Sequence, residues 1–178
     1  MVDPATTQRW GYRLLFVALA AVLLFLRLLP LDTMPATLPG PDLLLCLSFA
    51  WVQRRPDIVN PFLLGALLFL SDILLGRPPG LWAALVLLAA EFLRSRHQGS
   101  AEMPFAIELA FVSGTVIALA VAYWAALGIF AVPHPGLDEL LMQAIFTLMA
   151  YPVVAGLSRL AFNIRRLSPG ETETGALR

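Results

Sequence analysis

The sequence predicts an all-α integral membrane protein with six transmembrane helices, some of them short. Of its 178 residues, 59% are hydrophobic and 13% are charged, whereas a soluble domain averages about 25% charged residues. So few charged groups cannot cover the surface of a globule, and we therefore expect lipid to be the solvent of much of that surface. Apolar segments also recur along the chain, separated by short connections that contain proline, glycine or arginine.

The first apolar segment, residues 14–29, predicts the first transmembrane helix. Residues 30–41 hold four prolines and one glycine, which predicts a loop. The second segment, residues 43–52, is short, because about 20 residues are needed to cross the hydrocarbon core. We expect a short spanning helix there rather than a re-entrant segment, with Pro41 in its first turn and Asp42 near the positive end of its dipole.

Four further apolar segments follow at residues 58–76, 81–93, 105–132 and 137–161. The segment at 81–93 is again short, and the one at 105–132 is the longest. The last segment contains Pro152, which predicts a kink that neighbouring helices must accommodate.

The predicted membrane domain covers residues 14–166. A polar cytoplasmic lead, residues 1–13, precedes it. A tail at residues 167–178 follows, and its Ser, Thr, Gly, Pro and Glu content predicts disorder.

The predicted orientation follows from the arginines, which account for all twelve basic residues. With a cytoplasmic N-terminus and six crossings, ten arginines fall on the cytoplasmic side, and Arg27 and Arg77 fall on the outer side. Cytoplasmic loops of membrane proteins carry an excess of positive charge, so both termini are expected in the cytoplasm. The cytoplasmic arginines are Arg9, Arg13, Arg54, Arg55, Arg94, Arg96, Arg159, Arg165, Arg166 and Arg178.

Small residues recur at every fourth position of the fifth segment, on one face of a helix. Small residues mark close helix contacts in lipid, because the hydrophobic effect does not drive helices together there. We expect this face to be a tight helix–helix seam, although alanine is also simply frequent in this chain. The residues are Gly114, Ala118, Ala122 and Ala126.

Asp72 is the most conspicuous polar residue, because an ionisable group at membrane depth is costly and suggests function. It lies four residues before Gly76, near the end of its helix. It can therefore accept hydrogen bonds from the start of the next helix beyond the turn that ends at Gly80, or pair with Arg77. The alternative is that Asp72 binds a proton or cation. We favour the structural role, because the position is near a helix end rather than at mid-bilayer.

The remaining polar residues of the segments have simple structural interpretations. Glu91 and Arg94 are spaced for an i,i+3 ion pair. Glu108 lies in the first turns of a helix, where the dipole favours an acid. Cys46 is expected to be a small packing residue.

Three arginines near segment ends have several possible partners. Arg27 can extend to the membrane surface or pair with Asp32 or Asp42. Arg54 and Arg55 are interpreted as a topology signal, and they are also suited to bind anionic lipid or a cytoplasmic partner.

The sequence lacks the common catalytic motifs. It contains no HExxH, GxSxG, CxxC or phosphate-binding GxxxxGK[ST] sequence. No histidine lies within an apolar segment, and one aspartate lies well inside one, which disfavours serine and paired-aspartate membrane proteases. We therefore expect no enzyme activity, no cofactor, no metal and no nucleic-acid partner.

Residues 41–91 resemble the bacterial rod shape-determining protein MreD family. The family pattern is a proline-led apolar helix, a proline after a short loop, and an Asp-apolar-apolar-x-Gly turn closed by a Gly-apolar pair. One departure is Leu68, where the family often has glycine. The matching residues are Pro41, Asp42, Leu43, Leu44, Leu45, Trp51, Pro56, Val59, Asn60, Gly65, Asp72, Ile73, Leu74, Leu75, Gly76, Pro79, Gly80 and Leu81.

The resemblance implies a scaffold of the cell-wall elongation complex in the bacterial inner membrane. Such a protein binds the single-pass membrane protein MreC and acts with the actin homologue MreB, the glycosyltransferase RodA and the transpeptidase penicillin-binding protein 2. It also implies a fold similar to the substrate-binding subunits of energy-coupling-factor transporters. The alternative function is a small-molecule-binding subunit of a membrane transporter, for which Arg27, Asp32, Asp42, Asp72 and Arg77 would have to line the binding site.

Overall fold

Six α-helices make up the computed structural model, which describes residues 4–29, 39–97, 104–130 and 135–162. No strand occurs among those residues, so the predicted all-α class is confirmed. The helices are α1 (Pro4–Leu28), α2 (Leu43–Arg54), α3 (Pro61–Leu74), α4 (Leu81–His97), α5 (Phe105–Ile129) and α6 (Leu137–Phe162).

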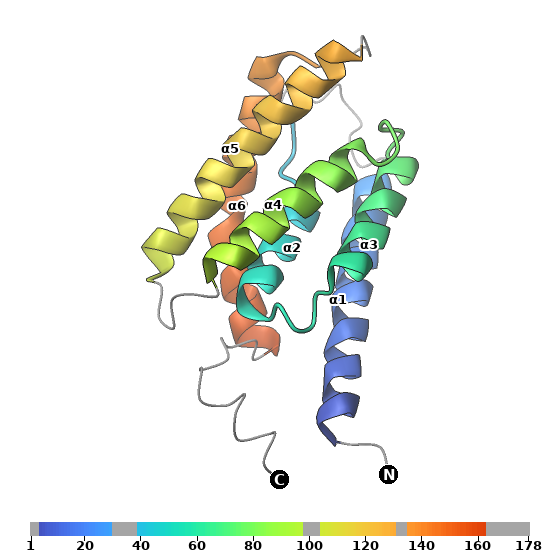
Figure 1. Ribbon diagram of the computed structural model, residues 1–178, viewed down its shortest axis with the longest axis vertical. Coiled ribbons are helices and arrows are strands. Elements are labelled where there is room, and N and C mark those ends of the chain that lie inside the picture. The colour runs from blue at the N-terminus through green and yellow to red at the C-terminus, as the bar shows by residue number, and fades with distance from the viewer. Residues whose placement is uncertain (1–3, 30–38, 98–103, 131–134, 163–178) are drawn as a thin grey trace.

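Successive helices run in alternating directions, so that the start of α1 and the end of α6 lie at the same end of the bundle (Figure 1). Helix α2 occupies the centre and contacts α6, α4 and α1. Every residue from Leu44 to Arg54 in α2 is buried. Helices α3 and α5 each pack against α4, and α5 also packs against α6. The bundle is therefore assembled around its shortest helix.

Within the described part of the chain, three helices are long and apolar enough to cross a membrane. They comprise Gln8–Leu28 in α1, Phe105–Ile129 in α5 and Leu137–Leu160 in α6. The apolar helices α2 and α3 have 12 and 14 residues, or about 18 Å and 21 Å at 1.5 Å per residue. A hydrocarbon core is about 30 Å thick, so crossing by the shorter helices stays a prediction.

The outside of the bundle carries large apolar side chains, as expected for a surface solvated by lipid. Phe62, Leu160 and Ile129 are at least 80% exposed. The interior is also apolar at its centre, where the rings of Trp51 and Phe16 are fully buried with their centroids 5.3 Å apart. An apolar exterior of this kind agrees with the low charge of the sequence.

Several predicted boundaries shift in the structure. Helix α1 begins at Pro4 and therefore includes most of the predicted polar lead. Asn60 caps α3, because its side chain accepts a hydrogen bond from the Phe62 N–H, so this helix starts at Pro61 rather than at residue 58. Pro41 precedes the capping residue Asp42 instead of lying in the first turn of α2. Pro152 does lie inside α6, as predicted.

The predicted seam on α5 is wrong within this chain. Gly114, Ala118 and Ala122 are exposed and Ala126 is only half-buried. A Cβ added at Gly114 would meet nothing within 4 Å. The first three residues instead line an open apolar groove of about 530 Å³ between α4 and α5. Spacing identified a face of small residues, but it did not determine whether another helix of the chain covers that face.

Some predicted features lie outside the described residues. They are the loop residue Asp32, the connections containing Gln98 and His134, the arginines Arg165, Arg166 and Arg178, and the tail at 167–178.

Candidate functional site

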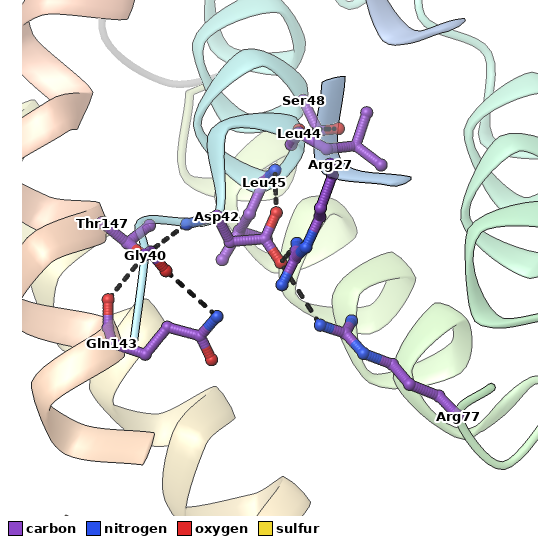
Figure 2. A network of polar contacts seen from close by, with 9 residues as sticks. All are labelled: Arg27, Gly40, Asp42, Leu44, Leu45, Ser48, Arg77, Gln143 and Thr147. Carbon is purple, nitrogen blue, oxygen red and sulfur yellow. Dashed lines mark hydrogen bonds and ion pairs between the residues drawn. The ribbon is translucent and has the colours of Figure 1, made fainter. Parts of the chain in front are cut away.

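A cluster of polar side chains surrounds Asp42, the N-cap of α2 (Figure 2). One carboxylate oxygen of Asp42 accepts a hydrogen bond from the Leu45 N–H at 3.1 Å. Its backbone N–H donates to the Thr147 hydroxyl at 2.9 Å, and the neighbouring Gly40 carbonyl accepts from the Gln143 amide at 3.3 Å. Asp42 therefore caps α2 and joins it to α6.

Two arginines from different parts of the chain converge on the second carboxylate oxygen of Asp42. Arg27, in the last turn of α1, lies 2.9 Å away, and Arg77, in the turn between α3 and α4, lies 3.8 Å away. The Arg77 guanidinium also stacks over the Trp82 ring at 5.1 Å from the centroid. Pairing of Arg27 with Asp42 was one of the predicted possibilities, whereas Arg77 pairs with Asp42 rather than with Asp72.

The two arginines determine the ionisation of Asp42. Burial alone would raise the pKa of this carboxyl, but Arg27, Arg77 and the Leu45 N–H together lower the pKa below its ordinary value of 3.8. Asp42 is therefore ionised at neutral pH although only 4% of the residue is exposed.

A cavity of about 290 Å³ opens beside this cluster. Its charged corner consists of Arg27, Asp42 and Arg77. The remaining wall is mainly apolar, with Trp82, Leu45, Val116, Ala120, Leu140, Ala144 and Pro135, and it includes the polar groups of Tyr123, Gln143 and Thr147. Residues from five helices thus enclose one cavity with a charged end.

Asp72 has the capping role that the sequence favours. One carboxylate oxygen accepts hydrogen bonds from the N–H groups of Gly80 and Ala83, both at 3.1 Å. Gly76 and Gly80 have φ values of 64° and 86°, a left-handed conformation that glycine adopts without steric cost. Asp72 is fully buried and joins the end of α3 to the start of α4. It does not line the cavity beside Asp42.

A buried polar network at α2, α5 and α6 was not predicted. Arg54 lies 3.1 Å from the Glu108 carboxylate and donates to the Ala50 carbonyl at 3.1 Å. The Tyr151 hydroxyl donates to the same Glu108 oxygen at 2.6 Å. Arg54 is 3% exposed and Glu108 is 1% exposed. Arg54 was interpreted first as a topology signal; the further possibility that it binds anionic lipid or a partner does not hold in this structure, because other helices cover its side chain.

A sequence signal for this network existed but was ambiguous. Glu108 and Arg54 are opposite charges at the predicted same end of two apolar segments, which is compatible with a pair. The same positions are equally typical of an acid at a helix start and of a topology-determining arginine. Only the packing of α2 at the centre distinguishes these interpretations.

Three other arginines that the sequence places on the cytoplasmic side, Arg55, Arg94 and Arg96, are less deeply buried than Arg54. Arg94 pairs with Glu91 at 2.5 Å, as predicted, and also donates to the Val59 carbonyl at 2.6 Å. Arg55 and Arg96 lie over the rings of Tyr12 and Phe92, respectively. Cys46 is buried, as predicted, and its thiol donates to the Thr147 carbonyl at 3.2 Å.

The arrangement around Asp42 is suited to binding charge rather than to holding a metal. Within the described residues there is no group of three or more His, Cys, Asp and Glu side chains that is placed to hold a metal ion.

Comparisons of the chain with models of protein families, with curated proteins and with solved structures found no match.

Proposed function

We propose that this protein is a non-enzymatic inner-membrane scaffold of the MreD type. In this proposal it helps to maintain rod shape by binding MreC and by positioning peptidoglycan synthesis. RodA, penicillin-binding protein 2 and MreB supply the catalytic and cytoskeletal parts of the complex. All six helices cross the inner membrane and both termini are cytoplasmic.

The main support for the proposal is that the residues shared with the MreD pattern have structural roles in the bundle. Asp42 and Asp72 cap helices, Gly76 and Gly80 form the turn before α4, and Trp51 fills the centre of the bundle. These residues organise short helices within the bundle and do not form a reactive group. A motif with this role is what a scaffold requires, because a scaffold acts through its shape.

In this proposal, the membrane helix of MreC binds in the groove between α4 and α5. Gly114, Ala118 and Ala122 have small side chains, so a second helix can approach α5 closely there. The groove is apolar and open, and no other helix of the described chain fills it. Van der Waals contact along such a face is a main source of helix association in lipid.

The proposed fold relationship is to the substrate-binding subunits of energy-coupling-factor transporters. Six helices of alternating direction, three of them with 17 or fewer residues, are compatible with that relationship. This relationship concerns only the arrangement of the helices; in the proposal, the partner proteins carry out the catalysis.

Co-expression with MreC tests the scaffold. An affinity tag on this chain should recover MreC from detergent extracts, and Ala118→Leu or Ala122→Leu should reduce the recovery at least several-fold by separating the two helices. The matched control is Ala106→Leu, because Ala106 is exposed on the same helix but outside the groove. Unchanged recovery of MreC with both groove variants would contradict binding of MreC in this groove.

A small-molecule-binding subunit of a transporter is the second candidate, and the cavity beside Asp42 favours it. A cavity with apolar walls and a few polar groups is typical of ligand sites, but about 290 Å³ is at the small end of the range for them. The same purification distinguishes the two functions, because a transporter subunit should recover ATPase subunits instead of MreC.

A further inference from the structure

The scaffold function leaves the cavity beside Asp42 unused, although three charged side chains, those of Arg27, Asp42 and Arg77, line it. We propose that this cavity binds a phosphate group, held between Arg27 and Arg77. The phosphate belongs either to the head group of an anionic phospholipid or to a soluble phosphate ester. This inference does not depend on the scaffold function, because it concerns a different surface from the α4–α5 groove.

The charge balance of the cavity favours an anion. Two guanidinium groups face a single carboxylate, that of Asp42, among the charged residues of the cavity wall. Both oxygens of that carboxylate are already engaged, one with Leu45 and the other with the arginines. Asp72, the next acidic group, caps α4 with one oxygen and acts electrostatically on Arg77 from outside the cavity wall. Within the wall itself, two positive charges therefore face one negative charge.

One nitrogen of the Arg77 guanidinium lacks a hydrogen-bond acceptor, which is the most specific indication that a ligand binds here. Its Nη1 atom is buried and has no hydrogen-bond partner among the described residues. The side chain is 17% exposed and is held in place by Asp42 on one side and by the Trp82 ring on the other. A buried guanidinium nitrogen without an acceptor is costly, and an anion that drew the Arg77 guanidinium toward the cavity would let Nη1 gain an acceptor.

Arginine is the side chain best matched to a phosphate, because its planar guanidinium donates two parallel hydrogen bonds to neighbouring oxygens. Arg27 approaches from α1 and Arg77 from the turn between α3 and α4, and they thus can contact two different phosphate oxygens. The rest of the wall is apolar at Leu45, Val116 and Ala120, which suits the glycerol or acyl part of a lipid. The site lies toward the end of the bundle at which α1 ends and α2 and α4 begin, and α5 and α6 extend beyond it (Figure 1).

The test uses the full chain in micelles of a non-ionic maltoside detergent, which carries no phosphate, with two probes. One probe is phosphatidylglycerol added to the micelles, and the other is glycerol 3-phosphate added to the buffer. Thermal unfolding measures stabilisation, and native mass spectrometry measures the phosphate-bearing molecule retained. We expect one of the probes to raise the unfolding temperature of the wild type, and this probe identifies the source of the phosphate.

Three variants locate the effect. Arg77→Gln removes the charge, and Ala120→Leu fills the cavity without changing any charge; each should weaken retention of the probe at least tenfold. Arg96→Gln removes an exposed arginine outside the cavity and should retain the wild-type response. If Arg77→Gln does not fold, Ala120→Leu alone decides.

Two results would overturn the proposal. One is the absence of stabilisation by either probe in the wild type. The other is a stabilisation that persists in Ala120→Leu or is lost equally in Arg96→Gln, which would indicate a general response to anionic lipid.

Discussion

Asp72 shows how a single carboxylate can hold a helix connection together inside an apolar bundle. One of its oxygens accepts from the N–H groups of Gly80 and Ala83. Asp72→Asn keeps an acceptor oxygen at this position, whereas Asp72→Ala leaves two N–H groups without a partner. We expect unfolding temperatures in detergent to fall in the order wild type, Asp72→Asn, Asp72→Ala, with the alanine variant destabilised by about 1–3 kcal/mol.

If the proposed scaffold function is right and Asp72 acts only by capping, rescue of rod shape in cells should follow the same order. Arg96→Ala serves as the control and should behave like the wild type, because Arg96 is exposed and lies over Phe92 near the end of α4, away from the Asp72 cap. A variant Asp72→Asn that is as stable as the wild type but inactive would contradict the structural role, since charge rather than an acceptor oxygen would then matter.

Asp42 should make stability depend on pH in the acidic range. Its folded-state pKa lies below the ordinary value of 3.8, mainly because Arg27 and Arg77 overcome the effect of burial. The stabilisation is therefore fully present above the unfolded-state pKa and is lost as the pH falls through the folded-state pKa. Thermal unfolding measured at decreasing pH should show this loss in the wild type and a smaller loss in Asp42→Asn. Equal pH dependence of the two proteins would exclude Asp42 as its source.

Helix α2 is held at the centre of the bundle by buried polar contacts at both of its ends. Asp42 and Thr147 join its start to α6, and Arg54 and Glu108 join its end to α5. A helix of 12 residues gains little stability from its own hydrogen bonds. Its position therefore depends on these contacts and on the apolar residues between them.

Breaking the Arg54–Glu108 pair on one side should be more harmful than removing both charges. Glu108→Leu leaves a buried, unpaired guanidinium and should cost about 3–5 kcal/mol. The double variant Arg54→Met, Glu108→Leu should recover part of that loss, because neither charge then needs a partner. Thermal unfolding of both single variants and the double variant gives the coupling free energy. Additive losses would contradict a direct interaction between the two side chains.

At the scale of elements, the features that depend on residues near one another in sequence were predicted, whereas the features that depend on how distant helices pack were not. The six helices, the Asp72 cap, the Glu91–Arg94 pair and the Pro152 position follow from hydrophobic runs, from turn residues and from residues near in sequence. The α5 face and the burial of Arg54 do not follow, because they depend on which helix packs beside another. Asp42 was expected to interact with the dipole of α2, but its contact with Arg77 joins residues 35 positions apart, and no local pattern indicates such a pair.

The whole molecule is expected to cross the membrane six times with both termini on the cytoplasmic side. The alternating helix directions and the common end shared by the start of α1 and the end of α6 support this topology (Figure 1). Cysteine-accessibility labelling in a Cys46→Ser background tests it. A thiol at Thr37 or His134 should react with an impermeant reagent from outside, and a thiol at Gln98 should not; all three positions lie outside the described residues.

The short helices make this topology the decisive question for the molecule. If neither α2 nor α3 crossed, Arg54, Arg55 and Arg77 would lie on the outer side with Arg27, and the arginine bias would fall from ten against two to eight against four. Thr37 and Gln98 would still face opposite sides in that case, so a third thiol at Asp57, between α2 and α3, is needed. Labelling of Asp57 from the outside would contradict the six-crossing arrangement. Labelling of Asp57 only from the inside would mean that the bilayer accommodates helices of about 18–21 Å, either by local thinning or by burial of their ends among α1, α5 and α6.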